Sequence, residues 1–345
     1  MGARAVIFGL SGPRLTPQER AFFAGVQPWG FILFARNVES PAQLQRLTAD
    51  LRDSVGRDAP VLIDQEGGRV ARLGPPHWRR WQPVMRLYAH SGANGADEER
   101  ALEATRLRYR IIAEELTGLG IDVDCMPLLD VPVPGADDVI GERALGLEQQ
   151  AVARRGRAIC DGLRAGGVLP VIKHLPGHGR AGVDSHLAMA RVTTPRETLE
   201  AVDFAAFRPL AGEPLGMTAH IVFEAIDPDG CATLSPTTIG VIRDDIGFDG
   251  LLMTDDLSMN ALTGTMADRT RGALAAGCDL ILHCNGDTAE MLEIAAATPL
   301  LGGPAARRAA RAEAERAKLR RVAEVIDIGA AEARYSELTG EELHA

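Results

Sequence analysis

Short apolar runs rich in β-branched residues recur along the chain, and stretches with helical periodicity lie between most of them. Eight of these runs have the length of a strand, which is roughly four to eight residues. They cover residues 5–10, 30–35, 60–64, 121–126, 168–174, 214–220, 249–255 and 278–283. Residues 97–118 illustrate the helical pattern, with apolar side chains near helical spacing at Ala104, Leu107, Ile111 and Leu116. The pattern therefore predicts strands and helices that alternate.

Eight strands, nearly all followed by a helix, predict a parallel sheet that closes on itself, the (β/α)8 barrel of TIM type within the α/β class. Such a barrel takes about 250 residues and tolerates insertions. The surplus in this chain of 345 residues fits the irregular stretch 65–95 and a mixed-charge helical tail at about 303–345. There is no internal repeat and no Gly/Ser-rich linker. We therefore expect residues 1–345 to form a single domain, with the tail as a C-terminal helical extension packed on its outside.

Composition narrows the choice of partners and compartment. The net charge is −10 and no basic stripe is present, which argues against nucleic acid as a partner. No apolar run approaches the roughly 18 residues of a membrane span, and the first apolar run is too short for a secretory signal. The five cysteines show no CxxC spacing, which is typical of free thiols in a reducing compartment. We expect a cytoplasmic protein with no membrane partner.

Titratable and polar residues gather at the carboxyl ends of the predicted strands, where this type of barrel places its active site. They are Arg36, Asn37, Asp64, Gln65, Glu66, Arg69, Asp130, Lys173, His174, His220, Asp255, Asp256 and His283. The strand starts are mostly apolar, glycine or proline, and this asymmetry indicates an enzyme. A carbohydrate-binding module would need exposed aromatic residues, which make up only 4% of the chain.

Some of these residues also have a purely structural interpretation. Asp256 at a strand end could equally be the N-cap of the next helix. His220 and His283, each taken alone, are more often hydrogen-bonded core histidines than catalysts.

The segment KHLPGHGRAGVDSH, residues 173–186, is harder to explain by packing. Its glycines and its proline favour a mobile loop, and Asp184 lies beside His186 in the sequence. A carboxylate near an imidazole favours the charged ring and fixes its tautomer, as in a tuned acid/base.

Three reaction classes fit these residues. A metal-dependent hydrolase could use His174, His178, His186, His220 and an aspartate, although the first strand ends in GLSG without the H-x-H of many barrel metallohydrolases. Phosphate chemistry would call for a P-loop motif, and none is present. Glycoside hydrolysis needs a nucleophilic carboxylate, a proton donor and groups that bind hydroxyls.

Four motifs together resemble the glycoside hydrolase family 3 β-N-acetylhexosaminidases, and more closely the bacterial single-domain enzymes that recycle cell-wall fragments. They are DQEGGRVAR (64–72), IGERALG (140–146), KHLPGHG followed by DSH (173–186), and GLLMTDDLSM (250–259). The resemblance runs in family order from about residue 30 to 285. One departure is Leu175, where the family usually has phenylalanine, and we expect it to alter loop packing rather than chemistry.

The resemblance implies a role for each matching residue. Asp255 would be the nucleophile that forms a glycosyl-enzyme, although spacing alone does not choose between it and Asp256, because adjacent strand residues point opposite ways. His186 would be the general acid/base, Asp184 would orient it, and His178 would be structural. The terminal N-acetylglucosamine would be bound by Asp64, Arg72, Arg143, Lys173 and His174.

Chain length supports the assignment of His186 as the general acid/base. Many family members carry a second domain that supplies a carboxylic acid/base, and a chain of 345 residues that builds a barrel has no room for one. The proton donor would then come from the barrel itself, and the Asp184–His186 loop is the best candidate. An imidazole also adds no negative charge near the nucleophile.

The expected function is the retaining hydrolysis of terminal, non-reducing β-linked N-acetylglucosamine. The resemblance implies muropeptides from peptidoglycan as the small-molecule substrate, specifically GlcNAc-anhydro-MurNAc in cell-wall recycling. We expect a monomer that needs no metal or other cofactor. The alternatives are a family 3 β-glucosidase-like enzyme for another sugar, or a metal-dependent barrel hydrolase.

Overall fold

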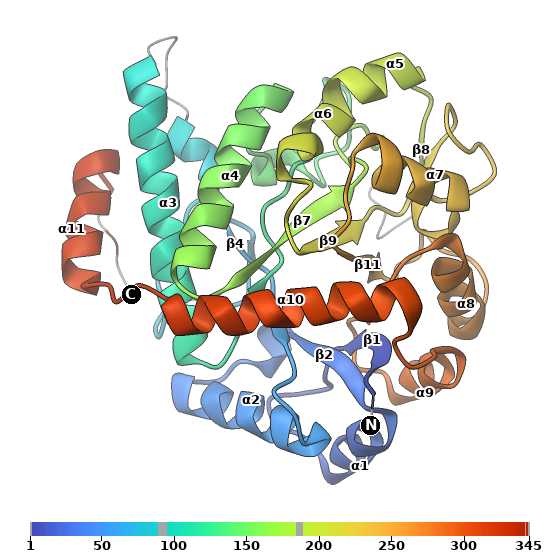
Figure 1. Ribbon diagram of the computed structural model, residues 1–345. Coiled ribbons are helices and arrows are strands. Elements are labelled where there is room, and N and C mark those ends of the chain that lie inside the picture. Colours follow the sequence, from blue (N-terminus) through green and yellow to red (C-terminus); the bar gives the residue numbers. More distant parts are fainter. Residues whose placement is uncertain (1, 89–94, 184–188, 342, 344–345) are drawn as a thin grey trace.

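The computed structural model describes residues 2–88, 95–183, 189–341 and 343. Eight parallel strands form a closed barrel at its centre, with helices around the outside (Figure 1). In order around the barrel they are β1 (Arg4–Phe8), β2 (Pro28–Leu33), β3 (Val61–Ile63), β6 (Val123–Asp124), β7 (Leu169–Leu175), β9 (Leu215–Thr218), β11 (Leu251–Asp256) and β12 (Leu280–His283). The last strand returns to the first, with Val6 beside Ile281. Each coincides with a predicted strand, so the predicted (β/α)8 barrel is confirmed.

The longer helices cover the outside of the barrel and begin and end at recognisable sequence signals. They are α1 (Pro17–Val26), α2 (Pro41–Val55), α3 (Gly95–Gly118), α4 (Gln149–Ala165), α8 (Met266–Ala276) and α9 (Thr288–Ala297). Helix α2, for example, begins where the Ser40 side chain accepts a hydrogen bond from the backbone N–H of Gln43. It ends at Gly56, whose φ of +62° is the left-handed conformation that glycine adopts without strain.

Two predicted helices are irregular, and one helix is not predicted by the sequence pattern. Residues 195–212 form α5 (Arg196–Thr198), a π-helical turn (Leu199–Asp203), α6 (Phe204–Phe207) and a 3-10 turn (Arg208–Leu210). Residues 235–247 form α7 (Pro236–Gly240) and a second π-helical turn (Val241–Asp245). A π-helical turn is defined by i→i+5 backbone hydrogen bonds, which the pattern of apolar residues does not reveal. The helix without a prediction is α9.

The stretch 65–95, predicted to be irregular, contains a small hairpin at the carboxyl end of β3. Strand β4 (Gln65–Gly67) pairs with the antiparallel β5 (Val70–Ala71), and a 3-10 helix follows at Val84–Tyr88. The turn between the two strands needs positive φ angles at Gly67 and Gly68. A further pair of short strands, β8 (Ala190–Val192) and β10 (Ile221–Phe223), lies beside the barrel.

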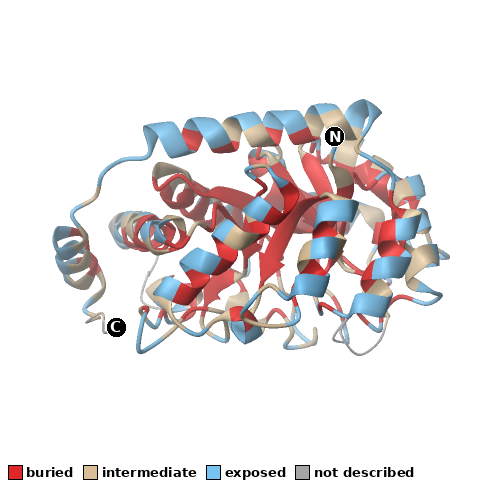
Figure 2. Ribbon diagram, turned by 90° about the horizontal axis from the view of Figure 1, so that it is seen from below, coloured by how far each residue is buried: buried red, intermediate tan, exposed pale blue. Residues whose placement is uncertain are grey.

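The hydrophobic core has two parts, one inside the barrel and one between the barrel and its helices (Figure 2). Helix α10 (Gly303–Val322) lies across the N-terminal end of the strands and adds Ala309, Ala312 and Leu319 to the inner part. On the same helix, the buried Arg316 pairs with Asp122, which precedes β6. The tail therefore closes one end of the barrel and leaves the opposite end, where the strands terminate, open.

The last helix packs on the outside of the barrel. Helix α11 (Ile328–Thr339) lies beside α3, and Tyr335 meets Trp81 edge-on with ring centroids 5.5 Å apart (Figure 1). In the part of the chain that the structure describes, no helix combines the length and the apolar character that a membrane crossing requires.

Candidate active site

A cavity of about 270 Å³ opens at the carboxyl ends of the barrel strands. Of the eight predicted site residues, six lie within the described part of the chain, and all six line this cavity: Asp64, Arg72, Arg143, Lys173, His174 and Asp255. They come from β7, β11, the 3-10 turn Gly141–Arg143 and the segments after β3 and β5. Asp184 and His186 lie outside the described residues. The barrel thus brings distant motifs to one place.

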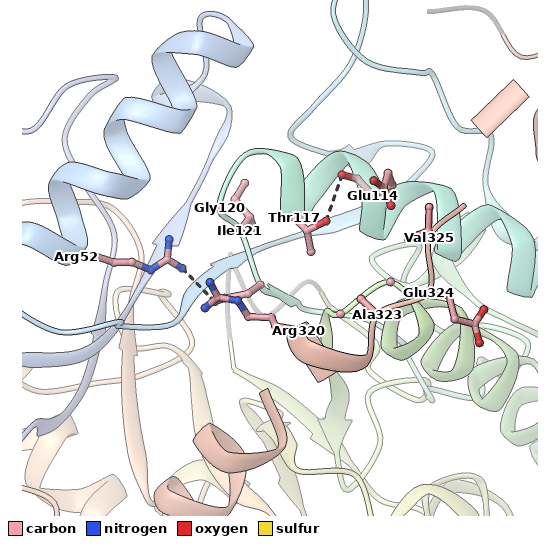
Figure 3. Close-up of a pocket in the computed structure, with 12 residues that line it drawn as sticks. Arg52, Glu114, Thr117, Gly120, Ile121, Arg320, Ala323, Glu324 and Val325 are labelled. Carbon is pink, nitrogen blue, oxygen red and sulfur yellow. Dashed lines mark hydrogen bonds and ion pairs between the residues drawn. The ribbon is translucent and has the colours of Figure 1, made fainter. Parts of the chain in front are cut away.

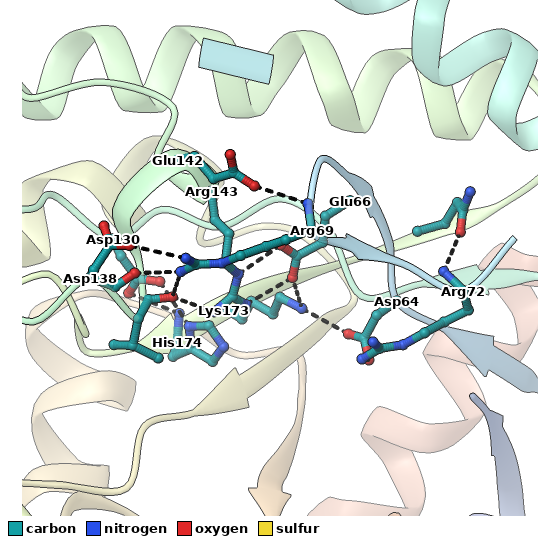
Figure 4. Close-up of polar contacts among 12 residues, drawn as sticks. Asp64, Glu66, Arg69, Arg72, Asp130, Asp138, Glu142, Arg143, Lys173 and His174 are labelled. Carbon is teal, nitrogen blue, oxygen red and sulfur yellow. Dashed lines mark hydrogen bonds and ion pairs between the residues drawn. The ribbon is translucent and has the colours of Figure 1, made fainter. Parts of the chain in front are cut away.

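Asp64 is held between two cations on the wall of the cavity (Figure 4). Its Oδ1 lies 2.9 Å from Nζ of Lys173, and its Oδ2 lies 3.0 Å from a guanidinium nitrogen of Arg72. Burial alone would raise the pKa of Asp64, but the charges of Lys173 and Arg72 outweigh it and hold the pKa well below its ordinary value. The Asp64 carboxylate is therefore ionised and acts as an acceptor.

Glu66 was not among the predicted site residues, yet it extends the same chain of charges (Figure 4). Its carboxylate accepts two hydrogen bonds of 2.9 Å from Arg143, and its Oε1 lies 2.7 Å from Nζ of Lys173. Arg72, Asp64, Lys173, Glu66 and Arg143 thus alternate in sign along one wall. The signal was present in the sequence, because Glu66 belongs to the DQEGG motif after the third strand.

The Glu66 contacts lead to a prediction for Glu66→Gln. Lys173 and Arg143 would lose their shared anionic partner and take up other positions, which should lower kcat/KM for an N-acetylglucosaminide by roughly tenfold to a hundredfold. Steady-state kinetics and the thermal unfolding midpoint would be measured together. Glu98→Gln is the matched control, because Glu98 accepts a similar pair of hydrogen bonds from Arg155 and does not line the cavity. An unchanged kcat/KM in Glu66→Gln would contradict the role of Glu66 in holding Lys173 and Arg143 in position.

His174 is oriented by Asp130, a fully buried carboxylate. Nδ1 of His174 lies 2.8 Å from Oδ2 of Asp130, whose Oδ1 accepts the backbone N–H groups of His174 (3.2 Å) and His178 (2.6 Å). Burial would raise the pKa of Asp130, but the effect of the His174 imidazole is larger and brings this pKa down to about 2. An ionised carboxylate only accepts hydrogen bonds, so Nδ1 of His174 carries a proton and donates it in a hydrogen bond to Asp130, which fixes the orientation of the ring.

His178 belongs to the same cluster. It lines the cavity, its ring lies 5.5 Å from that of His174, and burial lowers its pKa to about 4, so the ring is neutral near pH 7. The backbone hydrogen bond to Asp130 fixes its position in the chain. These contacts are compatible with the structural role that the family resemblance implies for His178.

The two adjacent aspartates at the end of β11 have different surroundings. The Asp256 carboxylate accepts hydrogen bonds from the Ser258 hydroxyl (2.6 Å) and from the backbone N–H groups of Ser258 and Cys284 (3.1 Å each). It therefore caps the turn after β11 and not helix α8, whose N-cap is Thr265. The Asp255 carboxylate accepts the backbone N–H of Asp256 at 2.8 Å and lines the cavity.

The charge state of Asp255 follows from its neighbours. Burial raises its pKa, but the imidazoles of His174 and His220 outweigh burial, and the pKa lies below its ordinary value. Near neutral pH the Asp255 carboxylate is thus ionised, and unlike Asp256 it does not hold the turn after β11. Of the two candidates that the sequence left open, the geometry favours Asp255 as the group available for chemistry.

The two remaining strand-end histidines are structural, the interpretation that the sequence favoured. His220 is fully buried, with Nδ1 2.8 Å from the Thr233 hydroxyl and Nε2 3.0 Å from the Asp256 carbonyl oxygen. His283 lies 2.7 Å from Glu290 through Nε2 and meets Phe8 edge-on. Neither lines the cavity.

The first half of the loop after β7 is packed closely. A side chain at Gly179 would collide with the carbonyl oxygen of Val131, and one at Gly177 would press against Asp203. The sequence predicted that the glycines make this loop mobile; at Gly177 and Gly179 they instead allow the backbone to approach its neighbours. A side chain at Gly182, in contrast, would begin in open space, with no atom within 4 Å of its Cβ apart from those of the chain neighbours.

A second cavity, of about 330 Å³, lies at the opposite end of the barrel between the end of α3 and the segment after α10 (Figure 3). Its cations Arg52 and Arg320 both pair with Asp122, at 3.0 and 3.6 Å. None of the predicted site residues lies there. Among residues 2–88, 95–183, 189–341 and 343, no group of three or more His, Cys, Asp or Glu side chains is arranged to hold a metal ion.

Comparison with known proteins identifies the family. Residues 15–316 match the N-terminal domain of glycosyl hydrolase family 3. A β-hexosaminidase of Alkalilimnicola ehrlichii is 37% identical over 285 residues, which cover 81% of this chain and 80% of that protein. A β-hexosaminidase of Pseudomonas aeruginosa is 33% identical over 306 residues, which cover 88% and 89%.

A solved structure agrees with these relatives. NagZ from Neisseria gonorrhoeae, in complex with N-trifluoroacetyl-D-glucosamine, has a TM-score of 0.84 and 30% identity, covering 98% of this chain and 99% of that one. The matches extend over nearly the whole barrel and its tail. The chain belongs to glycosyl hydrolase family 3, among the β-hexosaminidases of that family.

Proposed function

We propose that this β-hexosaminidase removes terminal, non-reducing β-linked N-acetylglucosamine with retention of the anomeric configuration. The observation that carries the proposal is Asp255, an ionised carboxylate that lines a cavity of sugar size together with the hydrogen-bonding groups of Asp64 and Lys173. The bound N-trifluoroacetyl-D-glucosamine in the Neisseria gonorrhoeae relative supports the choice of sugar. Retention requires a nucleophile and a separate proton donor.

In the proposed mechanism, an Asp255 oxygen attacks the anomeric carbon while the bond to the leaving oxygen breaks. His186 protonates that oxygen as it departs, and Asp184 orients the imidazole. In the second half, His186 takes a proton from water, the water oxygen attacks the anomeric carbon, and the bond to Asp255 breaks. Two inversions at one carbon give overall retention, and the enzyme returns to its starting protonation state.

The proposed sugar-binding groups divide by hydrogen-bonding type. Asp64 accepts hydrogen bonds from hydroxyls, and Nε2 of His174 makes one more hydrogen bond to the sugar. Lys173, Arg72 and Arg143 donate hydrogen bonds to sugar oxygens. Each of the three cations already pairs with Asp64 or Glu66, so it is held in place before the substrate binds. Binding groups that are oriented in advance lose less entropy when the sugar enters.

For the physiological substrate we propose muropeptides derived from peptidoglycan, specifically GlcNAc-anhydro-MurNAc in cell-wall recycling. This follows from the likeness to the recycling enzymes of the family. We further propose that residues 1–345 act as a single catalytic domain, as a monomer and in the cytoplasm. The five cysteines are all free, which supports a reducing compartment.

A substrate comparison tests the sugar and the reaction class. We expect a chromogenic β-N-acetylglucosaminide to be hydrolysed and the matching β-glucoside to be a poor substrate. NMR of the first-formed sugar should show the β-anomer. Preference for the glucoside would favour the β-glucosidase-like alternative.

The same assay tests the need for a metal. We expect dialysis against EDTA to leave the rate unchanged, because the proposal assigns the described cavity residues to proton transfer, sugar binding and nucleophilic attack. Activity that is lost on dialysis and restored by zinc or manganese would indicate a metal-dependent hydrolase.

A further inference from the structure

The loop that follows β7 begins on a firmly held stem, residues 176–182. On one side of the stem, the backbone N–H of His178 donates to the buried Asp130. Further along, the carbonyl oxygens of Gly179 and Ala181 accept hydrogen bonds from the N–H groups of Val133 (3.2 Å) and Asp137 (2.8 Å). The segment from Asp130 to Asp137 thus forms one wall for the stem.

The stem is also held by an ion pair. Nε of Arg180 lies 2.7 Å from Oδ2 of Asp203, with 13% and 1% of the two side chains exposed. Asp203 ends the π-helical turn Leu199–Asp203, so the pair connects the stem to the helical layer outside the barrel. Within the described ranges, Oδ1 of Asp203 has no hydrogen-bond partner, which makes Arg180 the main compensation for a buried charge.

We propose that Arg180 and Asp203 are positioning residues for the general acid/base. Asp184 and His186 follow Arg180 by four and six residues in the sequence. The stem sets the point from which the chain continues to these residues. The ion pair ties the stem to Asp203, in addition to its backbone hydrogen bonds to residues 130–137. Gly182, which is uncrowded, then connects the held stem to the catalytic segment. This inference rests on the proposed role of His186.

Arg180→Met keeps most of the side-chain length and removes the charge. We expect it to slow hydrolysis of N-acetylglucosaminides with poor leaving groups by roughly tenfold to a hundredfold, because a misplaced donor transfers its proton less well. A dinitrophenyl glycoside needs no proton to depart, so its release in the first step should hardly change. Arg180→Lys, which can restore the ion pair, should recover most of the loss.

The matched control is Arg243→Met. Arg243 pairs with Asp279 at the same distance of 2.7 Å and with similar burial (14% and 5% exposed), at the other end of the barrel. We expect it to lower the thermal unfolding midpoint without changing the dependence of the rate on the leaving group. If Arg180→Met folds poorly, Arg180→Met with Asp203→Asn removes both charges and leaves no unpaired carboxylate, and it should show the same leaving-group dependence.

A double-mutant cycle with His186→Ala separates the positioning role of Arg180 from the acid/base role of His186. If Arg180 acts through His186, adding Arg180→Met to His186→Ala should cause no further slowing with poor leaving groups. Full additivity, or equal slowing of activated and unactivated substrates by Arg180→Met, would overturn the positioning role. If His186→Ala alone lacks any leaving-group dependence, the proposed acid/base is wrong and the failure belongs to that assignment.

Discussion

Asp255→Ala should lower kcat by roughly 10⁴-fold or more, the size of loss seen when a catalytic nucleophile is removed. Without the carboxylate no glycosyl-enzyme can form, and no other carboxylate in the described part of the cavity is free of ion pairs or turn contacts. Kinetics with a chromogenic N-acetylglucosaminide measures the loss. The thermal unfolding midpoint should stay close to that of the wild type, because within the described part of the chain Asp255 accepts only a local backbone hydrogen bond.

Asp256→Asn is the matched comparison at the next position. An asparagine can still accept one hydrogen bond from the Ser258 hydroxyl or the Cys284 N–H, so the variant should retain more activity than Asp255→Ala. Trapping adds a direct test. A 2-deoxy-2-fluoro glycoside should accumulate on the wild-type enzyme, and peptide mass spectrometry should find the label on Asp255. A label on Asp256, or on any other residue, would show that the nucleophile has been assigned wrongly.

His186→Ala should slow the hydrolysis of unactivated N-acetylglucosaminides much more than that of a dinitrophenyl glycoside. The acid/base is used twice, first to protonate the leaving oxygen and then to deprotonate water. A dinitrophenolate departs without the first proton, but water attack remains slow. The covalent intermediate should therefore accumulate, with a burst of released phenol followed by a low steady rate. Azide, a nucleophile that needs no base, should raise that steady rate.

Two further variants sharpen this test. Asp184→Ala should give a milder form of the same behaviour, because it removes only the group that orients the imidazole. His174→Ala is the essential comparison, since His174 lines the cavity and is paired with the buried carboxylate of Asp130. We expect His174→Ala to weaken sugar binding for all leaving groups alike. If the burst and the azide response appear with His174→Ala and not with His186→Ala, then His174 is the acid/base.

The sequence by itself determined the architecture. Strands and helices alternate with different periods of apolar residues, and those periods are local properties that a single stretch of chain displays. The position of the active site followed from the same order, because the carboxyl ends of all strands in a parallel barrel meet at one end. Asp64, Lys173, His174 and Asp255 could be assigned to the cavity from the order of the strands alone.

The sequence could not show how the charges in the cavity pair with one another. Glu66, Arg143 and Lys173 are separated by 77, 107 and 30 positions, yet they form one hydrogen-bonded chain. Such pairing depends on the distances between strand ends and on the direction of each side chain. The same is true of Asp255 and Asp256, which are equivalent as sequence neighbours and both line the cavity. They differ because the Asp256 carboxylate accepts hydrogen bonds from Ser258 and Cys284 in the turn after β11.

Close packing was also decided by the tertiary structure alone. A glycine in a sequence has the same conformational freedom wherever it stands, so the glycines of the loop after β7 predict mobility throughout. At Gly177 and Gly179 that freedom is used to bring the backbone against Asp203 and Val131, which are distant in the sequence. Helix α10 likewise showed only mixed charge along the chain; its small apolar face closes the barrel because the strand starts offer a matching apolar surface.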